Sequence, residues 1–264
     1  MSTVAKYWRF LTAQWKVNLA SAMAYRVSFL SQTIFMFLND VLLLFIWWVL
    51  LERFPDIGGW GMSEIWLMWG LSAGGFGLMA IFCGNSYQFG ELIAAGQLDY
   101  YLALPKNPLL HILVSRMNMS GAGDLIFGLL IGAMGCYATR ASYLLFLLFM
   151  TTSGAILAGF FSIWQCLPFF IGRGDVVGRQ IGESLISFST YPGTIFQGAA
   201  RFITHFVIPA GFAVYLPVEL LASFTWKGLL SVWLAALVVW VIAVLVFRAG
   251  LRRYESGNQM VMRG

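Results

Sequence analysis

The spacing of the charged residues constrains this chain more than any other feature of its sequence. Only 10% of the residues are charged, and they gather in clusters separated by apolar stretches of roughly twenty residues or more. An α-helix that rises about 1.5 Å per residue needs about twenty apolar residues to cross the hydrocarbon core of a membrane. The sequence therefore predicts an all-α protein that crosses a membrane several times.

Composition excludes several other classes of protein. Hydrophobic residues make up 60% of the chain, against about 45–50% in a soluble domain. The formal charge of +5 is explained by the orientation of loops in a membrane, so we expect no nucleic-acid binding. Cys83, Cys136 and Cys166 lie in apolar sequence without a C-x-x-C pair, which predicts buried thiols rather than disulfides or a metal site. Residues 1–26 lack a continuous apolar core, so no cleavable signal peptide is expected.

Residues 1–264 are predicted to form one transmembrane domain with six spans. Residues 1–26 would form an amphipathic helix in the plane of the interface, because apolar residues recur there at intervals of three or four. The basic end of a tilted first span would give a similar pattern. A bundle follows over residues 27–246, and residues 247–264 form a basic tail. The spans are expected at residues 27–51, 62–84, 109–137, 142–171, from about Val176 onward, and 228–246.

The distribution of basic residues predicts the orientation. Six spans place both termini on one side, and that side would then hold most of the basic residues: Lys6, Arg9, Lys16, Arg26, Lys106, Arg173, Arg179, Arg248, Arg252, Arg253 and Arg263. The opposite side would hold only Arg53, Arg140, Arg201 and Lys227. Because cytoplasmic loops carry an excess of Lys and Arg, both termini and residues 85–108 are predicted to be cytoplasmic.

Two regions interrupt the apolar pattern. Residues 85–108 carry scattered polar side chains and predict a short helix, a glycine-containing turn and an apolar re-entry. Residues 191–224 are punctuated by Tyr191-Pro192-Gly193, Pro209 and Pro217, and proline interrupts a helix. We expect short helices there that enter one leaflet and return. Arg201 and His205, four residues apart, would share one helical face toward an aqueous exit.

Motifs for enzymatic chemistry are missing from the sequence. It contains no G-x-x-x-x-G-K-[ST], H-E-x-x-H or G-x-S-x-G pattern, so neither an ATP site nor a hydrolase site is expected. Ionisable residues within predicted spans are Asp40, Arg116 and Asp124, and such residues often mark an ion path. Structural pairing between helices is the interpretation we favour for them. The Gly70-x-x-x-Gly74 pattern permits close helix packing but is weak evidence for dimerisation.

The order of these elements resembles the membrane subunits of ABC-2-type ABC exporters. The run Ile93-x-x-Gly96-x-Leu98-Asp99-x-x-Leu102-x-x-Pro105 resembles the region after their coupling helix. One branch of the family, long catalogued as a family of unknown function, shows similar sequence at three places: Tyr191-Pro192 through Ile195-Phe196, Ile208-Pro209 with Leu216-Pro217, and Gly250 through Asn258. The resemblance spans essentially the whole chain. Leu104 departs from it, because many relatives carry a basic residue before this proline.

This resemblance implies a permease without enzymatic activity or cofactor of its own. ATP and Mg²⁺ would bind to a partner, and two ABC ATPase subunits and a second permease, identical or related, would complete an exporter in the bacterial inner membrane. Its substrate would be lipidic, amphipathic or polymeric. The residues expected to couple to the ATPase are Phe89, Gly90, Glu91, Leu92, Ile93, Gly96, Gln97 and Asp99. Those expected at an outer gate are Tyr191, Pro192, Ile195, Phe196, Arg201, His205 and Pro209.

Two other classes of function remain open at this stage. An ion-coupled secondary transporter would show paired repeats with broken or charged helices in corresponding positions. Only the late region is broken here, which disfavours that class. A membrane scaffold that transports nothing would need no ATPase partner.

Overall fold

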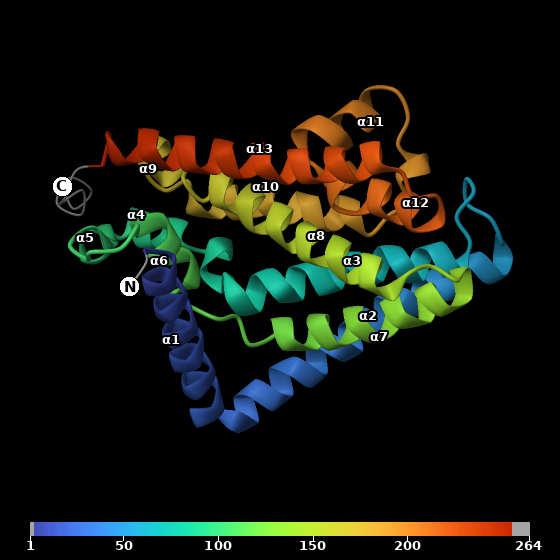
Figure 1. The fold of residues 1–264 in the computed structure, drawn as a ribbon, viewed down its shortest axis with the longest axis horizontal. Coiled ribbons are helices and arrows are strands. Elements are labelled where there is room, and N and C mark those ends of the chain that lie inside the picture. The colour runs from blue at the N-terminus through green and yellow to red at the C-terminus, as the bar shows by residue number, and fades with distance from the viewer. Residues whose placement is uncertain (1–2, 255–264) are drawn as a thin grey trace.

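A computed structural model describes residues 3–254, and in this part of the chain every regular element is a helix (Figure 1). The long helices are α1 (Thr3–Ala24), α2 (Arg26–Arg53), α3 (Met62–Phe82), α7 (Gly121–Thr139), α8 (Tyr143–Trp164), α10 (Asp175–Ser189) and α13 (Trp226–Leu251). Short helices connect α3 to α7, namely η1 (Gly84–Tyr87), α4 (Gly90–Ala94), α5 (Leu98–Leu102) and α6 (Pro108–Val114). Helix α9 (Pro168–Ile171) follows α8. Between α10 and α13 lie η2 (Gly193–Ile195), α11 (Ala199–Phe202), η3 (Ile203–Val207), η4 (Gly211–Tyr215) and α12 (Leu216–Ala222).

Six helices run side by side along the bundle. Five segments are long and apolar enough to cross a membrane: α2, α3, α7, α8 with α9, and α13. Helix α10 has 15 residues and therefore rises about 22 Å, yet it also connects the two ends of the bundle. We call the end where α1 begins and α13 ends the near end, and the opposite end the far end (Figure 1). The all-α membrane fold predicted from the sequence is confirmed.

A seam of glycines holds α3 against α7. A Cβ atom on Gly70 would lie 2.9 Å from the Cα of Gly132, and one on Gly77 would lie 2.5 Å from the amide nitrogen of Leu125. A Cβ on Gly128 would overlap with the backbone of Gly74. The Gly70-x-x-x-Gly74 pattern thus packs two helices of the same chain, so it gives no evidence for dimerisation.

The third span differs from its prediction. A single helix over residues 109–137 was expected, but the chain forms α6 and α7 with a break at residues 115–120. Asn118 stabilises the break, because its backbone N–H donates to the carbonyl of Ala80 at 2.9 Å and its side-chain oxygen accepts from the hydroxyl of Ser120 at 2.9 Å. Arg116 is therefore exposed in a linker whose other residues are partly buried, and it does not lie inside a span. The hairpin after α7 is formed as predicted, with Arg140 at φ 57° ending the helix.

A re-entrant hairpin occupies the far end. The segments Ala199–Val207 and Gly211–Ala222 meet at an angle of 77° around Pro209. Both outer ends of this hairpin lie at the far end, since Thr194 approaches Gly58 of the α2–α3 loop and Leu220 contacts Gly228 at the start of α13. The predicted interruptions near residues 192 and 209 are confirmed. Pro217 does not break the backbone as expected, because it occupies the first turn of α12, where a helix needs no N–H donor.

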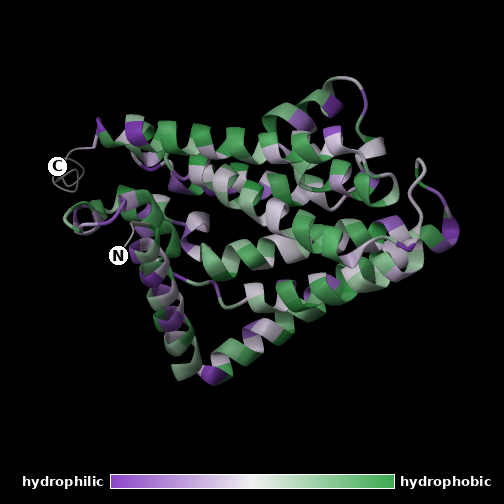
Figure 2. Ribbon diagram, in the orientation of Figure 1, coloured by the Kyte–Doolittle hydropathy of each residue, from purple (hydrophilic) through white to green (hydrophobic). Residues whose placement is uncertain are grey.

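The outer surface of the bundle is strongly apolar. Figure 2 shows hydrophobic residues along the spans, whereas hydrophilic residues gather at the ends and along α1. The least buried of the five spans are α2 and α13, because only 22% of the most apolar stretch of each is covered by the rest of the chain. Helices of this kind need a lipid or protein environment around them.

Candidate functional site at the near end

The segment between α3 and α7 forms a compact surface at the near end. Helices α4 and α5 are joined by a turn in which Gly96 has φ 68°, a backbone conformation that glycine adopts without strain. The backbone N–H of Gln97 closes this turn by donating to the carbonyl of Leu92 at 2.9 Å. The short helix and glycine turn predicted from the sequence are therefore present.

The apolar residues of this segment point into a second hydrophobic core. Phe89, Ile93 and Leu98 are buried there with six residues from α6 and from the chain around α8, α9 and α13: Leu109, Ile112, Leu113, Cys166, Phe169 and Phe247. Burial of this apolar surface fixes the segment on the ends of the spans. Three of the eight predicted coupling residues, Phe89, Gly90 and Ile93, therefore cannot touch another protein directly.

The opposite side of the segment is open. Glu91, Gln97 and Asp99 are exposed, as the sequence predicted. Tyr100 and Leu102 are also exposed, at 66% and 41%. Sequence analysis missed this pair, although an aromatic and an aliphatic residue within a polar stretch could have signalled it. Burial and the charge of Asp99 raise the pKa of Tyr254, which places the end of the described chain beside α5.

Two polar contacts join the segment to the spans α8 and α10. The backbone N–H of Gly90 donates to the side-chain oxygen of Gln165 at 2.8 Å, in a buried position at the end of α8. The guanidinium of Arg179 in α10 pairs with the carboxylate of Glu91 at 3.0 Å. Movement of α4 would therefore be passed to both spans.

Tyr87, just before the segment, makes a third contact with α10. Its hydroxyl donates to the carboxylate of Glu183. Burial of the tyrosine and its bond to Glu183 raise the pKa of Tyr87 to about 12. The tyrosine therefore stays protonated and keeps its role as a donor at neutral pH.

Helix α1 braces the same region from the side. The indole of Trp15 donates to the carbonyl of Phe82 at the end of α3, at 3.0 Å. The amide of Asn18 donates to the carbonyl of Val114 in α6, at 2.9 Å. The Lys106 ammonium lies 4.8 Å above the ring of Tyr7. These contacts attach α1 to both ends of the connecting segment.

The predicted outer-gate residues divide into three groups. Phe196, Arg201 and His205 line one polar pocket of about 330 Å³, together with Tyr215 and Glu219. Pro209 lies at the bend of the hairpin and lines a separate apolar groove. Tyr191 instead turns toward α2, with its ring 5.9 Å from that of Trp47.

The two remaining predicted gate residues, Pro192 and Ile195, line neither the polar pocket nor the apolar groove. Ile195 is exposed and Pro192 is buried. The hairpin is fixed to the top of α10 by the hydroxyl of Tyr215, which donates to the carbonyl of Phe188. Ring contacts of Phe196 with Phe188 at 5.3 Å and with Tyr215 at 6.1 Å support the same junction.

Two carboxylic acids are buried inside the bundle. Asp40 in α2 and Asp124 in α7 are each 3% exposed. One oxygen of each has no hydrogen-bond partner within the described residues, and neither acid belongs to an ion pair there. Within the same range, no group of three His, Cys, Asp or Glu side chains could hold a metal ion.

These features define an integral, multi-pass membrane protein with a helical platform docked at one end and a re-entrant hairpin at the other. A family model described as ABC-2 family transporter protein matches residues 37–258, and the chain belongs to this family. It is a membrane permease of an ABC transporter and works with an ATPase subunit. The resemblance noted in the sequence is thereby confirmed. No curated protein and no solved structure matched the chain.

Proposed function

We propose that this permease forms half of the path of an ATP-driven exporter for a lipidic, amphipathic or polymeric substrate. Two ATPase subunits would bind ATP and Mg²⁺, and this chain would supply no nucleotide site. A second permease, identical or related, would complete the path. The near end, with both termini, would face the cytoplasm of a bacterium, as the excess of basic residues on that side favours.

The polar face of α10 is the observation that carries this proposal. Gln180, Ser184 and Ser187 recur at intervals of four and three, so they lie on one face of a helix that crosses the bundle. Gln180 and Ser184 line an open groove of about 640 Å³, whose other lining residues are apolar: Val176, Val177, Ile181 and Ile208. The groove is therefore amphipathic. Polar side chains at membrane depth normally face water or another protein, so this face suits a path between two permeases, bordered by α2, α3 and α10.

The contacts of α4 explain how ATP hydrolysis could act on that path. Glu91 and Tyr87 both contact α10, through Arg179 and Glu183. We propose that the ATPase presses on the exposed side of α4 and α5, at Gln97, Asp99, Tyr100 and Leu102. The buried residues Phe89, Gly90 and Ile93 would hold the segment rigid, and the push would reach α10. The hairpin around Arg201, His205 and Pro209 would close the outer exit.

The experiment asks whether α10 faces water and moves during ATP turnover. Ser184→Cys is made in a variant whose three native cysteines are replaced, and the permease is assembled with its ATPase. A water-soluble thiol reagent should modify this cysteine at a rate that changes on adding ATP. The matched control is Leu237→Cys, on the exposed apolar face of α13, which should stay unreactive. Equal, ATP-independent rates at both positions would refute the path along α10.

A further inference from the structure

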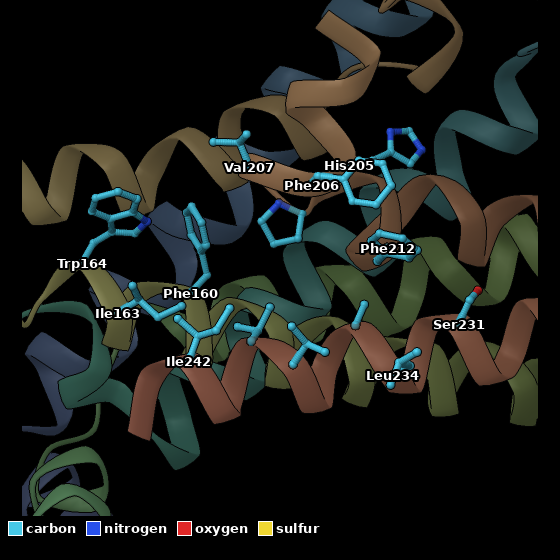
Figure 3. Close-up of a pocket in the computed structure, with 14 residues that line it drawn as sticks. Phe160, Ile163, Trp164, His205, Phe206, Val207, Phe212, Ser231, Leu234 and Ile242 are labelled. Carbon is cyan, nitrogen blue, oxygen red and sulfur yellow. The ribbon is translucent and has the colours of Figure 1, made fainter. Parts of the chain in front are cut away.

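An apolar groove runs between α8, α13 and the re-entrant hairpin (Figure 3). Its volume is about 540 Å³, which is within the range of pockets that hold small ligands. Phe160 and Trp164 of α8 form one wall, and Val207 and Phe212 of the hairpin form another. The tip of the hairpin lies between this groove and the groove along α10, because Val207 and Pro209 line the former and Ile208 lines the latter.

The third wall of the groove indicates its length. Ser231, Leu234, Val238 and Ile242 follow one another along α13 at intervals of three and four residues. Eleven steps of helix correspond to about 16 Å. This length is about half of a hydrocarbon core of about 30 Å, so the groove has the reach of an acyl chain in one leaflet.

His205 connects the apolar groove to the polar pocket at the far end, because it lines both. Its ring is held by an Nδ1–H that donates to the carbonyl of Arg201 at 2.9 Å. The ring also packs against Gly211, where a Cβ atom would leave no space for it. The two cavities adjoin at this ring, so a molecule with its apolar tail in the groove and its polar head in the pocket would lie across His205.

The polar pocket contains two opposite charges that do not neutralise each other. Arg201 and Glu219 both line it, and neither forms an ion pair with any residue in the described range. A guanidinium binds phosphate oxygens well, and a carboxylate accepts hydrogen bonds from an ammonium group. A head group that carries a phosphate and a primary ammonium would satisfy both.

From these two cavities we propose that the far-end half of this permease holds a resident aminophospholipid of the bilayer. One acyl chain lies in the groove along α13, and the head lies between Arg201 and Glu219. The lipid fills the space behind the re-entrant hairpin and supports it. This goes beyond the proposed export function and rests on it only for the role of the hairpin as a gate, since the lipid supports the hairpin from behind and is not the cargo.

The test uses the full chain in nanodiscs that contain a phosphatidylethanolamine with a photoreactive diazirine in one acyl chain. After illumination, mass spectrometry should find the label on peptides that contain Phe160, Trp164 and Val238. Ala235→Trp fills the groove and should lower this labelling about tenfold, whereas Leu237→Trp, on the exposed face of the same helix, should leave it unchanged. Folding is checked by thermal stability, and Ala235→Leu serves if the larger side chain is not tolerated.

The head group is tested separately. Arg201→Gln and Glu219→Gln should each lower labelling about tenfold, as expected for losing a hydrogen bond to a charged group. Lys227→Gln, which removes a cation at the same end outside the pocket, should have no effect. Equal labelling by a diazirine diacylglycerol would refute recognition of the head.

A third comparison separates a resident lipid from cargo and from a protein partner. In the transporter assembled with its ATPase, labelling should persist during ATP turnover. Labelling that disappears on turnover would identify the lipid as cargo and overturn the resident site. If the wild-type protein is not labelled, the resident lipid site is overturned as well. Crosslinks from the groove to a second permease chain, instead of to lipid, would show that the groove is occupied by protein. None of these results depends on how α10 responds to ATP.

Discussion

Arg179 and Glu91, 88 residues apart in the sequence, form an ion pair at 3.0 Å that ties span α10 to the short helix α4. The two side chains are 29% and 48% exposed, so the pair contributes at most about 1 kcal/mol to folding. The pair joins α4 to the helix that carries the polar face, so its role is to pass movement of α4 to α10.

Reversing the charges of this pair should separate an internal link from a contact with the ATPase. Glu91→Arg and Arg179→Glu should each reduce substrate-dependent ATPase activity by about tenfold, because like charges then repel α4 from α10. The double variant restores the pair and should recover most of the activity. If Glu91 instead touches the ATPase directly, the double variant will be as impaired as Glu91→Arg. Thermal unfolding should change little in all three.

Orientation can be measured with single cysteines at opposite ends of the bundle. Gln97→Cys lies on the exposed side of the near-end platform, and Ile57→Cys lies in the α2–α3 loop at the far end. An impermeant thiol reagent should modify position 97 only from the cytoplasmic side and position 57 only from outside. Both substitutions are made in a variant in which the three native cysteines are replaced, because Cys83 is only partly buried and would add background, whereas Cys136 and Cys166 are buried. Labelling of position 97 from outside would invert the topology and remove the basis for ATPase contact there.

The role of α1 as a brace depends on one indole N–H. Trp15→Phe keeps the ring contact with Phe82, at 5.0 Å, but removes the hydrogen bond to its carbonyl. The loss should be about 1 kcal/mol, seen as faster proteolysis within α1 and weaker coupling to the ATPase. Trp8→Phe is the matched control, because Trp8 is 61% exposed. Identical behaviour of the two variants would argue against the brace.

The glycine seam predicts a folding defect that is internal to one chain. Gly128→Val forces α7 away from α3, since even a Cβ atom at this position overlaps with Gly74. Overpacking of this kind costs about 1–3 kcal/mol or more, so the yield of folded protein should fall. Met134→Ala, at an exposed position of α7, should be tolerated. A variant that folds normally but no longer pairs with a second permease would show that the seam serves assembly instead.

The sequence predicted the spans because the bilayer requires a minimum apolar length, and that requirement is local. It also predicted the turn at Gly96 and the breaks at Pro192 and Pro209, where backbone chemistry is decisive. The break after α6 escaped prediction because a bond from Asn118 to Ala80, distant in the sequence, stabilises it. The partner of Gly70 and the pairing of Glu91 with Arg179 escaped for the same reason. The residue types in a segment show that a close contact is possible there, but they do not show which distant segment makes it.

The buried acids Asp40 and Asp124 distinguish an ATP-driven permease from an ion-coupled transporter. Neither is paired with a cation in the described part of the chain, and a carboxylate held at such depth costs several kcal/mol. Asparagine has nearly the same shape without that cost. The double variant Asp40→Asn/Asp124→Asn should therefore fold with equal or higher thermal stability. In membranes that contain the ATPase, its ATP-driven transport should stay within about threefold of wild type, a difference below 1 kcal/mol. Loss of transport in a stable protein, together with dependence on a proton or sodium gradient, would favour ion coupling through these two acids.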